Sequence, residues 1–149
     1  MKNLQNPFIV KLHYNFECDE KMYFVMDFLA GGELFDHLRK EQKFSEERSR
    51  FIAAEIILAL ECLHKNNIIY RDLKPENVLM DSEGHIKLTD FGLSKLLPNQ
   101  DEMAQTFCGT TEYLAPEVIA GNGHGKSVDY WSLVSTIVKF SIYFLFFRE

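Results

Sequence analysis

Two short segments contain the residue types that phosphoryl transfer requires. They are YRDLKPEN at residues 70–77 and DFG at residues 90–92. Phosphoryl transfer needs an oriented hydroxyl, a held triphosphate and metal ions that absorb charge, with little covalent chemistry from the protein. In the first segment, Asp72 can accept the proton of a substrate hydroxyl, and Lys74 can neutralise the phosphate that is transferred.

The same segments offer ligands for a metal ion. Asn77 and Asp90 carry hard oxygen atoms of the kind that Mg²⁺ prefers, so ATP and Mg²⁺ are the predicted cofactors. An isolated DFG is usually only a turn. Here DFG begins 18 residues after Asp72 (90 − 72), and APE follows at Ala115–Glu117. The order of the three segments matches the signature set of protein kinases.

Strands and turns must position these loops. Residues 8–16 and 21–27 are rich in β-branched and aromatic side chains and are separated by the polar residues CDEK, which predicts a hairpin. Residues 33–41 are predicted to form a short helix. A second hairpin is predicted from residues 78–80 and 85–88, which flank DSEG.

A long helix is predicted from Ser45 to about Lys65. Ser45 is a good N-cap residue, and Glu46 and Glu47 favour the positive start of a helix. The helix is apolar on nearly all faces, which predicts a place in the middle of a domain. Residues 89–126 show no regular pattern, and a loop of that length in a compact domain is usually functional.

Composition narrows the class of protein. The 149 residues suit one domain, and a net charge of −6 disfavours nucleic acid while suiting a basic protein substrate. The three cysteines form no CxxC and predict free thiols in a reducing compartment, so we expect a cytoplasmic or nuclear protein. Residues 1–10 contain no long apolar run, so we do not expect a signal peptide there.

The most apolar stretch lies near the C-terminus. Leu133–Phe147 is 15 residues long by count and is interrupted by Lys139, whereas a membrane span needs about 20 residues. We therefore expect a buried helix and no membrane span.

Further motifs carry a resemblance to a family. The chain contains YRD at residues 70–72, DFGLSK at 90–95, TFCGT and YLAPE between 106 and 117, and FVMDFLAGGELF at 24–35. From about Asn6 to Leu133 it resembles the AGC group of serine/threonine protein kinases, and the ribosomal-protein-kinase and Akt-like branches most, between which the motifs do not choose.

The resemblance implies an architecture. We expect an α+β, mainly helical, partial protein kinase fold with the end of the small lobe and the first part of the large lobe. Residues 1–133 would form the partial kinase domain, and residues 134–149 a divergent hydrophobic tail.

The resemblance also implies catalytic roles. The catalytic residues would be Asp72, Lys74, Asn77, Asp90 and Thr110, with Asn77 and Asp90 as the metal ligands. Thr110 would steady Asp72 and Lys74, a mark of specificity for serine and threonine. In addition, Asp129 would tie the helix that follows to the segment at residues 70–77, the catalytic loop.

A nucleotide site is implied in the same way. Met26 corresponds to the gatekeeper, and Asp27 and Leu29 would offer backbone groups to adenine. Glu33 would lie near the ribose, and Leu79 would form the floor beneath the adenine ring.

Substrate and regulatory residues complete the implied set. Glu33 and Glu76 would read arginine in a protein substrate that has basic residues before its target serine or threonine. Thr106 would be phosphorylated by an upstream activating kinase, with Arg71 and Lys95 as partners of the phosphate.

Two functions stay open at this level. The sequence contains no G-x-G-x-x-G segment and no VAIK-type lysine before the hairpin, and its tail departs from the family pattern, so we expect a truncated kinase. The chain is then either an ATP-dependent protein kinase or a catalytically inactive fragment that still binds substrates or a regulator. A third possibility, a membrane-tail product, rests on residues 140–147 alone.

Overall fold

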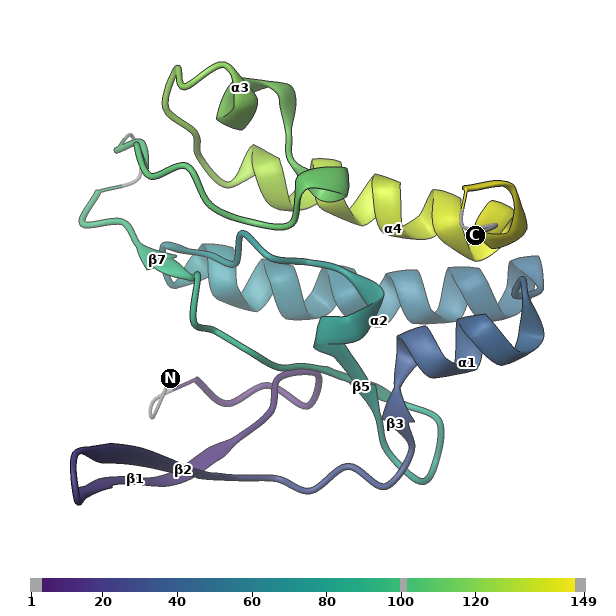
Figure 1. Ribbon diagram of the computed structural model, residues 1–149, viewed down its shortest axis with the longest axis horizontal. Coiled ribbons are helices and arrows are strands. Elements are labelled where there is room, and N and C mark those ends of the chain that lie inside the picture. The colour runs from purple at the N-terminus through teal and green to yellow at the C-terminus, as the bar shows by residue number, and fades with distance from the viewer. Residues whose placement is uncertain (1–3, 100–101, 147–149) are drawn as a thin grey trace.

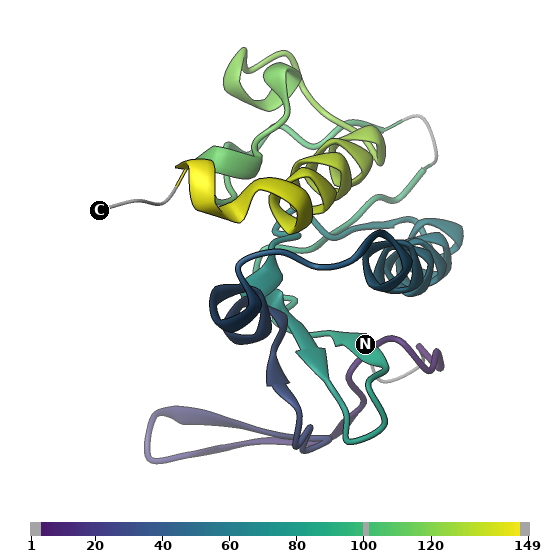
Figure 2. The ribbon, with the colours of Figure 1, turned by 90° about the vertical axis from the view of Figure 1, so that its right-hand side faces the viewer.

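A computed structural model describes residues 4–99 and 102–146 (Figure 1). The long helices α2 and α4 lie side by side, α1 contacts α4, and the strands other than the short pair β4 and β7 lie on the other side of α2 from α4 (Figures 1 and 2). Helices and strands both contribute substantially to these residues. The fold is therefore mixed, and the prediction of a mainly helical fold is not confirmed.

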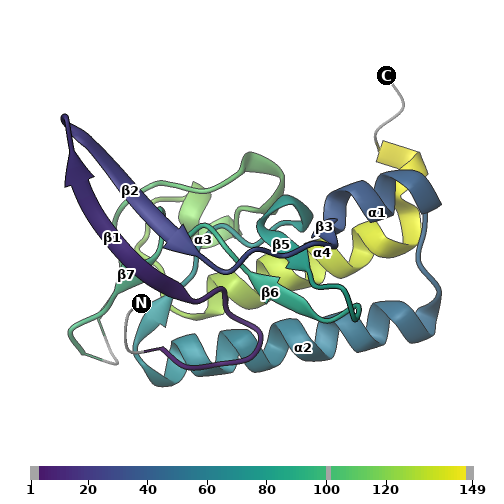
Figure 3. The same cartoon turned by 90° about the horizontal axis from the view of Figure 1, so that it is seen from below.

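The first hairpin consists of β1 (Leu12–Cys18) and β2 (Lys21–Met26), which pair antiparallel. Asp19 and Glu20 both have positive φ, at 50° and 61°, so they form the two-residue turn that suits the twist of a hairpin. Figure 3 shows this hairpin projecting from the rest of the chain.

The predicted first strand began too early. Its first residues, from Phe8, run beside β6 (Ile86–Leu88) and not beside β2. The Val10 N–H donates to the Leu88 carbonyl at 2.9 Å, and the Leu88 N–H donates to the Phe8 carbonyl at 2.9 Å. Because residues 8–10 pair with a strand that is distant in sequence, β1 begins only at Leu12.

The second hairpin is confirmed and gains a third strand. Strands β5 (Val78–Met80) and β6 pair antiparallel, and β3 (Gly32–Glu33) joins the open edge of β5. Gly31 precedes β3 where the backbones come very close. A Cβ atom there would lie 2.6 Å from the carbonyl oxygens of Met80 and Asp81, so only glycine fits.

Helix α1 spans Leu34–Glu41 and α2 spans Glu46–Lys65, as predicted. The Ser45 hydroxyl caps α2 by accepting a hydrogen bond from the Arg48 N–H at 3.2 Å. Helix α2 contacts both α4 and β6, but neither covers its remaining side, where Phe51, Ile57 and Leu58 are each about half exposed.

Helix α4 spans Ser127–Phe146, so a helix over the apolar stretch is confirmed as far as residue 146; Phe147 lies outside the described residues. Phe140 is fully buried against Phe44, with ring centroids 5.4 Å apart. Within the described residues, no helix is long and apolar enough to cross a membrane. The boundary expected at residue 133 falls inside α4, and the division into a domain and a tail stays a prediction.

Short elements hold the region between residues 89 and 126. Strand β7 (Lys95–Leu96) pairs with β4 (Ile68–Ile69), and α3 (Pro116–Ile119) follows the 3₁₀ turn at Thr111–Tyr113. Ala104 and His124 also exchange backbone hydrogen bonds, at 2.8 and 2.9 Å. The segment is irregular, as predicted, but it is anchored at both of these points.

Candidate active site

The carboxylate of Asp72 is fixed from two sides. The Asn77 side-chain amide donates to Asp72 Oδ2 at 2.8 Å and to the Asp72 carbonyl at 2.8 Å. The Thr110 hydroxyl donates to Asp72 Oδ1 at 2.8 Å. Asp72 is buried, with 7% of its surface exposed. Because each oxygen has a donor, the carboxylate has one orientation and stays a hydrogen-bond acceptor.

Lys74 joins the same group. Its ammonium donates to Thr110 Oγ1 at 2.8 Å and lies 3.3 Å from Asp72 Oδ2. The Thr110 hydroxyl therefore accepts from Lys74 and donates to Asp72, bridging the two charges. A 3₁₀ turn at Pro75–Asn77 shortens the loop, so that Asn77 can reach back to Asp72.

The DFG segment lies beside this loop. The Thr89 N–H donates to the Asn77 carbonyl at 3.0 Å, which sets Asp90 next to the catalytic loop. The Tyr70 hydroxyl donates to the Thr89 carbonyl and strengthens the same connection. Burial, together with the negative charges of Asp72, Asp90 and Asp129, raises the pKa of Tyr70 well above its usual value. The phenol thus keeps its proton and remains a donor.

Two oxygen donors at this junction fit a magnesium ion. The Asn77 amide nitrogen faces Asp72, which leaves the amide oxygen on the other side. Asp90 is exposed and accepts only the Gly92 N–H, at 3.1 Å, among the contacts found. No group of three or more His, Cys, Asp or Glu ligands occurs among residues 4–99 and 102–146. Mg²⁺ typically takes one or two carboxylates and completes its shell with phosphate and water.

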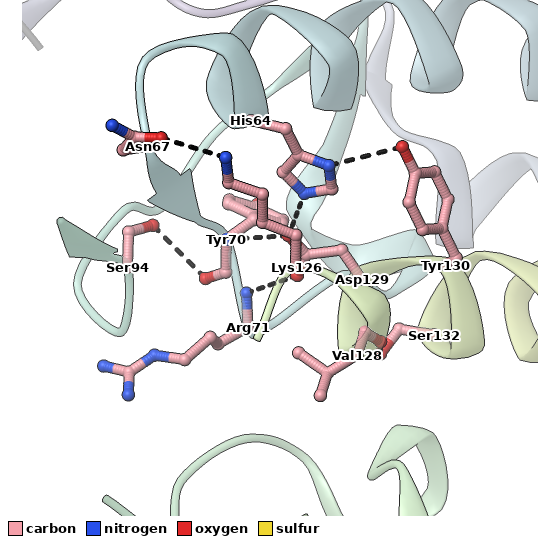
Figure 4. A network of polar contacts seen from close by, with 10 residues as sticks. All are labelled: His64, Asn67, Tyr70, Arg71, Ser94, Lys126, Val128, Asp129, Tyr130 and Ser132. Atoms are coloured by element: carbon pink, nitrogen blue, oxygen red, sulfur yellow. Dashed lines mark hydrogen bonds and ion pairs between the residues drawn. The ribbon is translucent and has the colours of Figure 1, made fainter. Parts of the chain in front are cut away.

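A buried carboxylate anchors the catalytic loop to α4. Asp129 is fully buried and accepts hydrogen bonds from the Tyr70 N–H at 2.9 Å and the Arg71 N–H at 2.8 Å (Figure 4). This contact was expected from the resemblance. Arg71 has a positive φ of 71°, so the carboxylate holds a strained backbone in place just before Asp72.

His64 is a third partner of Asp129 that the sequence did not indicate. Its Nε2 lies 2.7 Å from Asp129 Oδ2, and its Nδ1 lies 3.3 Å from the Tyr130 hydroxyl (Figure 4). His64 and Asp129 are 65 residues apart, and the last turn of an amphipathic helix gives no spacing signal for such a pair. Only the packing of α2 against α4 reveals it.

Among the predicted nucleotide residues, Met26 shares a cavity with the DFG segment. It lines a cavity of about 400 Å³ together with Val10, Leu12, Phe24 and residues 89–92. Hydrogen bonds from His13 (2.8 Å), Lys87 (3.1 Å) and the Lys11 N–H (3.3 Å) hold Asp27 in place. Burial pushes the pKa of Asp27 up, but those hydrogen bonds outweigh it and leave the pKa below its usual value.

The other three predicted nucleotide residues, Leu29, Glu33 and Leu79, lie in or next to strands β3 and β5. Glu33 and Leu79 are register partners in the β3–β5 pair, so they sit side by side although 46 residues separate them (79 − 33). The Leu29 carbonyl accepts the Gly32 N–H at 3.4 Å, in the turn that leads to β3. None of these three lines the 400 Å³ cavity.

Comparison with known proteins places this arrangement in a family. The sequence matches the family described as "Protein kinase domain" over residues 1–149. The chain belongs to the protein kinase family. It is 61% identical over 130 residues to "Protein kinase 2" of Dictyostelium discoideum, covering 87% of this chain and 27% of that protein.

Other relatives carry related names. The "RAC family serine/threonine-protein kinase homolog" of Dictyostelium discoideum is 55% identical over 141 residues, which cover 93% of this chain and 32% of the relative. The human "Ribosomal protein S6 kinase alpha-2" is 56% identical over 132 residues, 89% of this chain and 18% of the relative. The chain thus spans less than a third of these kinases, and the resemblance to AGC serine/threonine kinases is confirmed.

In this kinase chain, Arg71 lies close to the irregular region between residues 89 and 126, which contains Thr106. Arg71 Nε donates to the Leu93 carbonyl at 2.6 Å, whereas its buried Nη1 has no hydrogen-bond partner within the described part of the chain. Arg71 lines a small cavity with Cys108, which is two residues after Thr106. Thr106 itself is exposed. Lys95 is exposed on β7.

Proposed function

We propose that this chain carries the catalytic loop of an enzyme that transfers a phosphoryl group from ATP to a serine or threonine hydroxyl of a protein. The observation that carries the proposal is the closed group of Asp72, Asn77, Thr110 and Lys74, joined by hydrogen bonds of 2.8 Å. Catalysis of this reaction depends on positioning and on electrostatic stabilisation, and a preorganised group of this kind supplies both.

Each member of the group has a separate role. Asp72 orients the substrate hydroxyl and accepts its proton, because both carboxylate oxygens have fixed directions. Lys74 places a positive charge beside the hydroxyl, where negative charge develops on the transferred group. Thr110 accepts from Lys74 and donates to Asp72, so its hydroxyl fixes the position of the ammonium relative to the carboxylate with which it pairs.

The cofactors would be Mg²⁺ and ATP. Asn77 and Asp90 would hold the metal ion, which offsets the charge of the phosphates when bound. Met26 and the backbone of Asp27 and Leu29 would contact adenine, with Leu79 beneath the ring and Glu33 near the ribose. The pairing of Glu33 with Leu79 supports a common site for those two.

We further propose a preference for arginine three residues before the target serine or threonine. Glu33 and Glu76 carry this proposal, since carboxylates pair bidentately with a guanidinium. Glu33 is exposed, and Glu76 Oε2 is buried without a hydrogen-bond partner among the described residues. A buried carboxylate oxygen of that kind favours a cationic ligand.

Phosphorylation of Thr106 by another kinase is proposed as the regulatory step. A phosphate adds about −1.5 to −2 charge and can order a loop through cationic partners. Nη1 of Arg71 has no hydrogen-bond partner among the described residues and Lys95 is exposed, so both would be available as such partners.

A second candidate function is binding without turnover. It is favoured by one observation: the 149 residues contain no G-x-G-x-x-G segment to cover the phosphates. Such a chain would bind a substrate or an activating kinase and transfer nothing.

One experiment separates the two functions. The 149 residues are joined behind the glycine-rich loop and lysine strand of a related kinase, and radiolabelled phosphate transfer from ATP to an arginine-containing serine peptide is measured. Transfer that Asp72→Asn abolishes supports the enzyme. A folded chimera that binds ATP and peptide but transfers no phosphate supports binding alone.

A further inference from the structure

Lys139 is the one charged residue that interrupts the apolar stretch at residues 133–147. The helix does not leave it in solvent. Its side chain is half-buried and lines a cavity of about 120 Å³ together with Glu76, Thr110 and Glu112. A lysine placed there needs an explanation, because burying an ammonium is costly unless the charge has a use or a partner.

The position of the ammonium is defined by Tyr113. Lys139 Nζ donates to the Tyr113 hydroxyl at 2.7 Å and lies 4.0 Å from the centroid of the same ring. A cation over an aromatic face is held by the ring quadrupole as well as by the hydrogen bond. The charge is therefore fixed in the cavity wall.

The cavity adjoins the hydrogen-bonded group of Asp72, Asn77, Thr110 and Lys74. Thr110 lines it, and the Thr110 hydroxyl is the atom that bridges Asp72 and Lys74. A peptide whose hydroxyl meets Asp72 must therefore bring a neighbouring side chain to this cavity. Residue 76, two positions after Lys74, lines the same cavity, so the catalytic loop itself forms one wall.

The charges in the cavity oppose one another. Burial lowers the pKa of Lys139, and the carboxylates of Glu76 and Glu112 act in the opposite direction by favouring the ammonium form. Without Lys139, the two carboxylates would make the cavity a receptor for a cationic side chain. The positive charge of the ammonium offsets part of the negative potential from the two carboxylates and repels a second cation.

We propose that Lys139 is a specificity-determining residue, which excludes arginine and lysine from this cavity and selects an uncharged or acidic side chain next to the substrate hydroxyl. The proposal rests on the proposed function, since it assumes that a peptide is held at Asp72. It limits the preference for arginine to the side chain that Glu33 reads, because Glu76 shares its cavity with Lys139, which would repel a second basic residue.

Peptide binding to the 149-residue chain tests this without requiring turnover. Short fluorescent peptides carry one serine and an arginine three residues before it, and each other position near the serine is set in turn to Arg, Ala or Asp. Dissociation constants are measured by fluorescence anisotropy for the wild-type chain, Lys139→Met and Lys139→Gln. Gln keeps a donor for Tyr113 but removes the charge, so it serves if the Met variant does not fold.

Two matched variants complete the design. Lys65→Met removes the same charge from an exposed site on α2, where Lys65 pairs with Glu61 at 2.7 Å. Lys139→Arg keeps the charge. If Lys139 acted only by supporting Tyr113, then Tyr113→Phe would shift the charge preference as much as Lys139→Gln does.

The expected result is specific to one peptide position. There, the wild-type chain and Lys139→Arg should bind Asp or Ala peptides more tightly than the Arg peptide, and loss of the charge should improve Arg binding relative to Asp by about fivefold to tenfold. The proposal is overturned if Lys65→Met gives the same shift, if no position responds to Lys139, or if no peptide binds. Phosphate transfer by the chimera described above judges the proposed function separately.

Discussion

Replacing Asp129 by asparagine should loosen the catalytic loop, even though the two side chains have nearly the same shape. The carboxylate accepts three hydrogen bonds, from the N–H groups of Tyr70 and Arg71 and from His64 Nε2, and it is fully buried. An asparagine offers one oxygen and one NH₂ group. In either orientation, the NH₂ group faces at least one buried N–H donor.

The magnitude follows from that geometry. A buried donor left without an acceptor costs about 1–3 kcal/mol, and the remaining bonds each weaken by about 1 kcal/mol when the acceptor loses its charge. The free energy of unfolding should fall by about 3–5 kcal/mol, a large share of the roughly 5–15 kcal/mol of a typical domain. Arg71, at a φ of 71°, should be the first residue to relax.

Two measurements on the 149-residue chain test this. Urea unfolding gives the overall loss, and amide hydrogen exchange should show the N–H groups of Tyr70 and Arg71 exchanging about 10²-fold faster or more. Asp81→Asn is the control, because Asp81 Oδ1 accepts the Glu83 and His85 N–H groups at 2.8 and 2.9 Å in an exposed turn, where water can replace it. Equal losses for the two variants would refute the reasoning from burial.

Three further predictions concern turnover, pH and modification. The 149 residues by themselves should transfer phosphate more slowly than about 1 per second, because they contain no glycine-rich segment to hold the phosphates. The hydrogen bond and charge of Glu55 raise the pKa of His85 above 6.5, so this pair should add stability below pH 6.5 and lose it as pH rises through the raised pKa. Urea unfolding from about pH 5 to about pH 8 measures this. Phosphopeptide mapping should find phosphate on Thr106 when the activating pathway is on.

Each of these has a control and an outcome that contradicts it. Transfer at about 1 per second or faster that Asp90→Ala abolishes would show the first to be wrong. Glu55→Gln should remove most of the pH dependence of the free energy of unfolding. An unchanged pH dependence would show that it does not come from the pair of His85 and Glu55. Consistent absence of phosphate from Thr106 in activated cells counts against the third.

The sequence by itself determined the local elements and the chemistry. The hairpin at 78–88, the capped helix from Ser45 and the helix over the apolar stretch, as far as residue 146, follow from patterns that act over a few residues. The types and order of Asp72, Lys74, Asn77 and Asp90 are those that phosphoryl transfer requires, so the proposed chemistry could be inferred without a fold. These are local signals, since turn chemistry, capping and ligand type need no distant partner.

Tertiary structure decided what depends on long-range contact. Whether α2 is buried on one side or on all sides depends on what packs against it, and the start of β1 depends on pairing with β6. The same is true of His64, which meets Asp129 only because α2 lies against α4. Lys139 looked like an interruption in an apolar run, and only the packing of α4 beside Thr110 sets it in a cavity at the catalytic loop. Contacts between residues that are distant in sequence leave no period or motif in one sequence, because each partner could be satisfied in many other ways until the chain has folded.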